Sequence, residues 1–230
     1  GASERHAVFN DFWRHLDRHY AVFDEHLDGQ SWDQVGAAAC PALDAANTDD
    51  ALYDVILDTA RALDDGHLTL NAKDIGRKDD AWVSAYPHYD DMYDLEGHVE
   101  EAYLDGDLKW GAKDWFAWGT IGDIGYVSIT SMDGLSNGGE RKDQDAAAEA
   151  MDEVLADFLS TSGLIIDVRA NEGGWDTVSL EIARRVAGDR AVAWSKATRD
   201  GPEHSDFSEY VETYVEAATA NAYDKPVVLL

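Results

Sequence analysis

The sequence predicts an α/β (α+β) fold, in which an N-terminal helical subdomain precedes a mixed-sheet core with crossover helices. Two observations support this prediction. Apolar side chains recur at helical spacing through the first part of the chain, whereas the later part alternates short apolar runs with helical stretches. We therefore divide the chain into a helical subdomain over residues 1–70 and an α/β core over residues 71–230.

Three helical stretches make up the predicted helical subdomain. Aromatic and apolar residues share one face of a helix over residues 4–26. A shorter helix opens at Ser31 and is interrupted by Pro41, which lacks the amide hydrogen that a helix needs. A third helix over residues 49–66 starts at an aspartate cap and stops at a glycine.

The core begins with short aromatic and β-branched runs that predict strands over residues 82–86, 98–104, 114–118 and 124–130. Asp105-Gly106, between two of these runs, is typical of a hairpin turn. Helices over residues 145–159 and 176–188 then alternate with strands over residues 164–168, 191–194 and 226–230. Because the last run reads as a buried strand, we expect this core to be a fragment, truncated at its C-terminus.

The charge balance is strongly acidic, with 18 Lys and Arg against 47 Asp and Glu and a net charge of −29. Such a field repels phosphate backbones and anionic head groups, so we expect neither nucleic acid nor a membrane as a partner. The carboxylates run through the whole chain, which favours a hydrated, halophilic surface over an ordinary acidic secreted protein. The single cysteine, Cys40, excludes an intrachain disulfide.

The segment from Asp167 to Gly174 is the most informative candidate site. An apolar strand ends there, a polar turn with Gly173 and Gly174 follows, and a helix begins. Ligands of open α/β sheets bind at the carboxyl ends of strands, where free amides suit an anion such as the oxyanion of a tetrahedral intermediate. Asp167 and Arg169 would brace this loop as a pair. The alternative is a plain turn in which the glycines only permit close packing.

His67 is the second candidate, since it directly follows Gly66 at a turn between a helix and a strand. A histidine held there can act as a general base near neutral pH; the alternative is an ordinary surface histidine. His15, His19 and His26 share one flank of the first helix and would suit a metal, but no fourth ligand follows from the pattern. We expect no metal and no cofactor.

These segments occur in a familiar order. After an aromatic N-terminal helix come Leu-Asp-Asp-Gly-His-Leu at 63–68, a strand from Ile124, Asp-x-Arg-x-Asn-x-Gly-Gly at 167–174 and Lys-Pro-Val-Val-Leu-Leu at 225–230. Over nearly its whole length the chain resembles the C-terminal-processing (tail-specific) serine peptidase family, which includes the tricorn protease core. The resemblance implies that His67 is the general base, that Gly173 or Gly174 contributes an amide to the oxyanion hole, and that Asn171 supports the loop with Asp167 and Arg169.

The chain departs from the family pattern in two ways. Only about fifty residues separate Leu70 from Ile124, too few for the PDZ domain that many members insert there, so the chain resembles the PDZ-less branch. The family's nucleophilic serine follows the strand that matches residues 226–230. We therefore expect the nucleophile beyond Leu230, and the 230-residue chain alone to be inactive.

The resemblance implies a serine endopeptidase or carboxy-terminal processing peptidase acting on a peptide or an unfolded protein. A non-catalytic ligand- or peptide-binding protein on the same fold is the alternative. Because such peptidases are commonly exported, we expect a periplasmic or extracellular location.

Overall fold

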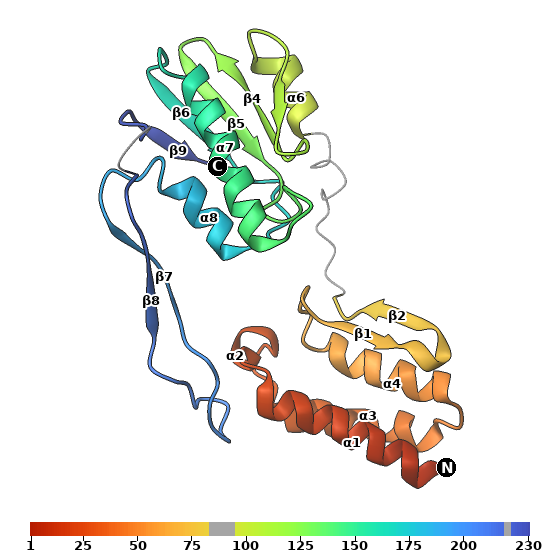
Figure 1. Ribbon diagram of the computed structural model, residues 1–230. Helices are drawn as coiled ribbons and strands as arrows, with labels where there is room; N and C mark the ends of the chain where they lie inside the picture. Colours follow the sequence, from red (N-terminus) through yellow and green to blue (C-terminus); the bar gives the residue numbers. More distant parts are fainter. Residues whose placement is uncertain (83–94, 219–221) are drawn as a thin grey trace. The chain divides into compact units, whose positions relative to one another are not determined.

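The computed structural model describes residues 1–82, 95–218 and 222–230, and the chain divides into two compact units (Figure 1). The helical unit comprises Gly1–Ala85 and Lys196–Val211, and the sheet unit comprises Tyr86–Ser195 and Glu212–Leu230. Helices precede a mixed sheet with crossover helices, which confirms the predicted fold class. The domain boundary expected after residue 70 stays a prediction.

The helical unit begins with α1 (Ala2–His19) and the short α2 (Phe23–His26). The single helix predicted over residues 4–26 is therefore wrong. The chain leaves the helix at Tyr20, whose backbone is extended, with φ −73° and ψ 131°. The apolar pattern continues across this break because Tyr20 and Phe23 enter the same buried aromatic cluster, with ring centroids 5.0 Å apart.

Helix α3 (Trp32–Ala45) begins with a capping box in which Ser31 Oγ accepts the amide of Gln34, and the Gln34 side chain accepts the amide of Ser31. The interruption predicted at Pro41 is wrong, because the helix continues through it to Ala45. Pro41 and Ala37 are both exposed, so water can satisfy the Ala37 carbonyl that the proline leaves without an amide partner.

Helix α4 (Asp49–Arg61) completes the helical layer. Its cap is Thr48, whose Oγ1 accepts the Ala51 amide at 3.1 Å, rather than the predicted aspartate. The helix ends at Arg61, five residues before the glycine that the sequence suggested. The antiparallel strands β1 (Thr69–Ala72) and β2 (Arg77–Asp80) follow, joined by the 3-10 turn η1 (Lys73–Ile75).

The sheet unit is built on five strands in the order β3-β4-β5-β6-β9. Their bounds are β3 Lys109–Gly111, β4 Phe116–Ile121, β5 Ile124–Ile129, β6 Gly163–Asp167 and β9 Val227–Leu229. The first three pair antiparallel and the last three pair parallel, so the mixed sheet is confirmed. Helix α7 (Glu140–Asp157) crosses over from β5 to β6, and α8 (Asp176–Ala183) follows β6 (Figure 1).

Helices cover both faces of this sheet. Residues of α7 and α8 pack on one face, against Phe116, Val127 and Ile166, and α6 (Leu95–Tyr103) packs on the other through Val99. The strands β7 (Ala191–Lys196) and β8 (Val211–Val215) form a separate two-stranded sheet. In the sequence they lie on either side of Lys196–Val211, the later segment of the helical unit. None of the described helices is long and apolar enough to cross a membrane.

Several predictions for the core are corrected by the structure. The strand predicted over 98–104 is wrong: residues 98–103 belong to α6, which buries Val99 in a cluster with Leu108 and Tyr126. The Asp105-Gly106 turn therefore joins a helix to β3 instead of closing a hairpin. The strand predicted over 82–86 lies, except for its first residue, outside the described residues.

The last strand also differs from expectation. β9 is an edge strand of the sheet, and Val228 and Leu229 are 53% and 68% exposed, so the expectation of a buried strand is wrong. An apolar run predicts burial only where neighbours cover both faces, and the described elements leave these side chains accessible.

Phe158 fixes the contact between the C-terminal end of α7 and the sheet. Its ring is 1% exposed and lies over Gly125 of β5, where an added Cβ would come within 2.6 Å of the ring. The neighbouring Leu159 is 79% exposed. The same turn thus presents one core side chain and one surface side chain.

Phe158→Ala should lower the free energy of unfolding of the sheet unit by about 3–5 kcal/mol, because it opens a cavity over β5. Leu159→Ala, the matched control, should change it by less than about 0.5 kcal/mol. Urea unfolding followed through the amide signals of β5 and β6 checks both values. Equal effects of the two substitutions would contradict this assignment of the core.

Candidate functional site

The candidate loop begins at Asp167, the last residue of β6, whose side chain is almost fully buried. Arg169 donates to both carboxylate oxygens, from Nε at 3.0 Å and Nη2 at 2.7 Å, and the Tyr126 hydroxyl donates to Oδ2 at 3.0 Å. Burial by itself would raise the pKa of Asp167, but the hydrogen bonds from Arg169 and Tyr126 outweigh it and lower the pKa. The base of the loop is therefore an ionised, fully paired carboxylate.

Asn171 ties the loop to the neighbouring strand. Its Nδ2 donates to the Ile129 carbonyl at the end of β5, at 2.8 Å. Its Oδ1 accepts the backbone amide of Gly173 at 2.7 Å. The amide of Gly173 is therefore already engaged within the loop.

Gly174 makes the closest backbone approach in this region. Its φ is +135°, and an added Cβ would lie 2.2 Å from the carbonyl carbon of Met132. The Met132 amide donates to the Gly173 carbonyl at 2.7 Å, and the Trp175 amide donates to the Met132 carbonyl at 3.0 Å. These two hydrogen bonds lie on either side of Gly174, and the amide of Gly174 takes part in neither. Gly174 is an exposed residue.

The segment that receives Gly174 is itself organised by Asp143, which sequence reasoning missed. This residue of α7 is 1% exposed, and its carboxylate accepts the amides of Gly134 at 2.9 Å and Ser136 at 2.6 Å. Burial opposes ionisation, but these bonds outweigh it and lower the pKa of Asp143. A signal existed in the sequence, because Asp143 shares helical spacing with the buried Ala147 and Met151.

His67 belongs to the helical unit, whereas the glycine loop belongs to the sheet unit. Its side chain is 99% exposed, and its Nδ1 lies 3.1 Å from Oδ1 of Asp65. That same oxygen accepts the backbone amide of His67 at 2.9 Å, and the Tyr20 hydroxyl donates to Oδ2 of Asp65 at 2.8 Å. The sequence placed Asp65 in the motif but indicated no role for it or for Tyr20.

The metal hypothesis rested on three histidines of the helix predicted over residues 4–26, of which the structure places His15 and His19 in α1 and His26 in α2. The rings of His15 and His19 lie 4.8 Å apart, whereas His26 packs edge-on against Tyr20. Within residues 1–82, 95–218 and 222–230, no group of three or more His, Cys, Asp or Glu side chains is placed to hold a metal ion.

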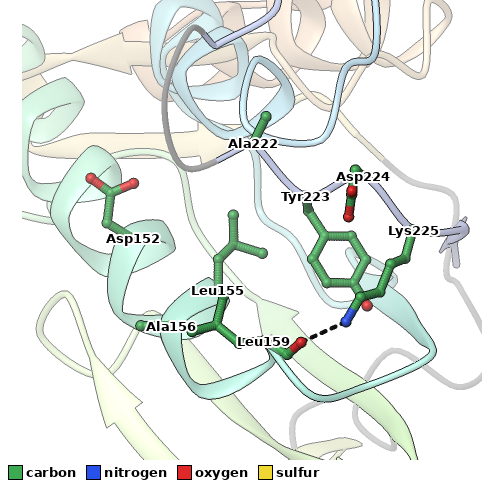
Figure 2. A pocket seen from close by; sticks show the side chains of 8 residues that line it. All are labelled: Asp152, Leu155, Ala156, Leu159, Ala222, Tyr223, Asp224 and Lys225. Atoms are coloured by element: carbon green, nitrogen blue, oxygen red, sulfur yellow. Dashed lines mark hydrogen bonds between the residues drawn. The ribbon is translucent and has the colours of Figure 1, made fainter.

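A cavity of about 250 Å³ lies at the C-terminal end of α7 and shares no residue with the glycine loop (Figure 2). Leu155, Leu159 and Tyr223 supply its apolar lining. The Lys225 ammonium at its edge donates to the carbonyls of Leu159 and Thr161. This lysine is therefore held as a structural cation that fastens the segment before β9 to the end of α7.

Gly174→Ala should lower the free energy of unfolding of the sheet unit by about 2 kcal/mol or more, because the new side chain meets the Met132 backbone at an unfavourable φ. Gly188→Ala is the control, since a Cβ there meets nothing within 4 Å; stability should stay constant or rise by up to about 1 kcal/mol. Chemical denaturation of both variants checks this. A Gly174→Ala variant as stable as Gly188→Ala would disprove the close approach.

Three solved structures share the fold of this chain. A chain described as a candidate peptidase from Parabacteroides merdae ATCC 43184 superposes with a TM-score of 0.73 at 23% identity, over 96% of the present chain and 65% of its own length. Two structures of mature CPAF, one complexed with lactacystin, give TM-scores of 0.54 and 0.55 at 13% and 11% identity, over 85% of the present chain and 60–61% of theirs. These similarities show a shared fold, and the present chain spans less than two thirds of each of these structures.

Family models match both parts of the sequence, although no curated protein does. Residues 2–59 match the tricorn protease C1 domain, which covers α1 to most of α4. Residues 123–230 match peptidase family S41, and this match contains β5, the glycine loop and β9. The resemblance to C-terminal-processing serine peptidases is thereby confirmed: residues 123–230 are similar to peptidase family S41, and residues 2–59 are similar to the tricorn protease C1 domain.

Proposed function

We propose that the protein is a serine-type peptidase that hydrolyses peptide bonds through an acyl-enzyme. The observation that carries this proposal is the glycine loop after β6, inside the segment that matches family S41: Gly174 is an exposed residue, and its amide takes no part in the backbone bonds on either side of it. An amide fixed by flanking backbone bonds suits the oxyanion of a tetrahedral intermediate, because it requires no rearrangement when charge develops.

Gly174 is the better donor of the two candidate glycines. The amide of Gly173 donates to Asn171 Oδ1 within the loop, so using it would break a 2.7 Å hydrogen bond. The amide of Gly174 carries no such cost. Asp167, Arg169 and Asn171 support the loop without contacting the reacting atoms.

His67 is the proposed general base. A serine hydroxyl attacks the peptide carbonyl carbon and gives its proton to the imidazole. The imidazolium then protonates the leaving amine as the peptide bond breaks, and a water molecule, deprotonated in the same way, releases the acyl group. We expect the serine after β9, as in the family, so residues beyond Leu230 are needed for turnover.

Peptides or unfolded proteins are the proposed substrates, because acyl transfer at a solvent-exposed loop requires an extended chain that can reach it. Both internal cleavage and trimming at a carboxyl terminus fit this chemistry. The non-catalytic binding alternative has no specific support among the described contacts.

His67→Ala, made in the protein extended beyond Leu230, should lower kcat on an unstructured peptide by about 10²–10⁴-fold, the usual contribution of a general base. His15→Ala is the matched control, since it removes an exposed histidine from α1 and should leave kcat unchanged. Steady-state kinetics on both variants measure the difference. Full turnover by His67→Ala would remove this residue from the mechanism.

We also propose that the acidic composition suits a saline environment outside the cytoplasm. With a net charge of −29, the carboxylates on the folded surface repel one another, and salt screens that repulsion. The export expected of the family is compatible with this setting.

The melting temperature should therefore rise by several degrees between low salt and about 1 M NaCl, where the Debye length falls to about 3 Å. Differential scanning calorimetry at fixed pH makes the measurement, with NaCl and KCl compared to separate screening from a specific ion effect. A melting temperature that stays constant or falls would contradict the saline proposal and leave the peptidase proposal intact.

A further inference from the structure

We propose that Asp65 is a positioning residue, which holds the proton of the neutral His67 imidazole on Nδ1 and leaves Nε2 free to accept the proton of the nucleophile. This inference rests on the proposed function of His67. It adds to the mechanism a carboxylate two residues before the histidine, in the same turn.

The geometry fixes which nitrogen carries the proton. Oδ1 of Asp65 lies 3.1 Å from Nδ1 of His67 and also accepts the His67 backbone amide at 2.9 Å. An ionised carboxylate can only accept hydrogen bonds, so Nδ1 must be the donor. The lone pair of the neutral ring then lies on Nε2, the nitrogen that faces away from Asp65.

The ring depends on this contact for its orientation. The His67 side chain is 99% exposed, so packing from the described residues does not hold it. The bond to the backbone amide fixes Asp65 relative to the His67 main chain, and the bond to Nδ1 fixes the ring. One carboxylate oxygen thus fixes both the backbone of the turn and the orientation of the His67 ring.

Asp65 is itself held firmly. Its side chain is only 11% exposed, and Oδ2 accepts the hydroxyl of Tyr20, whose ring is buried beside Phe23. The carbonyl of Tyr20 in turn accepts Nη1 of Arg199 at 2.7 Å. A chain of contacts therefore runs from Arg199 through Tyr20 and Asp65 to His67, entirely within the helical unit.

The surroundings keep the carboxylate charged. Burial acts to raise the pKa of Asp65, but the hydrogen bonds from His67 and Tyr20 outweigh it and lower the pKa, with a smaller contribution from His26. The pKa of Tyr20 is raised by burial and by Asp65, so its hydroxyl remains a donor. The Glu25 charge also raises the pKa of Tyr20, and the Arg199 guanidinium donates to the Tyr20 carbonyl.

Two other histidine–aspartate pairs of this chain use a different ring nitrogen from the pair of His67 and Asp65. His6 approaches Asp44 and His204 approaches Asp17 through Nε2, at 3.1 and 2.9 Å. Such pairs leave Nε2 occupied and unable to serve as a base. His67 instead pairs through Nδ1 and keeps Nε2 exposed.

The experiment reads the tautomer directly from the ¹⁵N shifts of the His67 ring in the 230-residue chain, at about pH 8.5, where an ordinary histidine is neutral. We expect the Nδ1–H form to predominate in the unmodified chain. Predominance of the Nε2–H form would overturn the proposal, and this arm requires no variant to fold.

Two variants separate positioning from a structural effect. Asp65→Asn should shift His67 toward the Nε2–H form and, in the extended protein, lower kcat by about tenfold or more. Asp44→Asn is the matched control, because it makes the same change of charge beside His6 and should leave the His67 tautomer and kcat unchanged. A folded Asp65→Asn variant with the original tautomer overturns the role of Asp65.

The outcomes also separate this inference from the proposed function. If His67→Ala abolishes turnover but Asp65→Asn leaves the tautomer of His67 unchanged, the peptidase proposal stands and the positioning role fails. If the tautomer depends on Asp65 but His67→Ala retains full turnover, His67 is no base, and the positioning role in catalysis fails with it.

Discussion

The site in the sheet unit depends on one backbone contact, between Gly174 and Met132. The segments after β5 and after β6 lie so close there that no side chain fits between them. Three separate elements enforce this contact: Asn171 anchors the loop to the end of β5, Asp143 of α7 shapes the segment that includes Gly134, and the pairing of β5 with β6 brings the two strand ends together. The position of Gly174 therefore results from the packing of the whole crossover unit.

In the helical unit, too, a buried aspartate holds an exposed group in place. This unit presents a solvent-exposed histidine whose orientation comes from a buried carboxylate below it, and the break between α1 and α2 is part of that arrangement. By leaving the helix at Tyr20, the chain turns a tyrosine toward Asp65 while the ring stays in the aromatic core. In both units a buried, charged aspartate, paired by several donors, is the rigid base beneath an exposed functional group.

The sequence predicted well where one pattern decides the outcome. The buried strand that ends at Asp167 follows from its continuous apolar run, the buried face of α7 follows from apolar periodicity, and the motif order indicated the family. The sequence predicted secondary structure poorly where tertiary contacts determine it. α6 was mistaken for a strand because its aromatic and β-branched residues have strand propensity, and Pro41 was expected to end a helix that packing carries on. The roles of Asp65 and Asp143 could not be inferred because acidic residues are abundant throughout this chain, so their partners alone distinguish them.

In the mechanism proposed above, the Gly174 amide binds the oxyanion of a serine-type acyl transfer. The most direct test is a crystal structure of the protein extended beyond Leu230, with a peptidyl boronic acid bound to its nucleophile as a mimic of the tetrahedral intermediate. We expect a boronate oxygen at about 2.7–3.1 Å from the backbone nitrogen of Gly174, with Asn171 still bonded to the Gly173 amide. A boronate oxygen directed to other donors, with the Gly174 amide facing away from it, would contradict this role of Gly174.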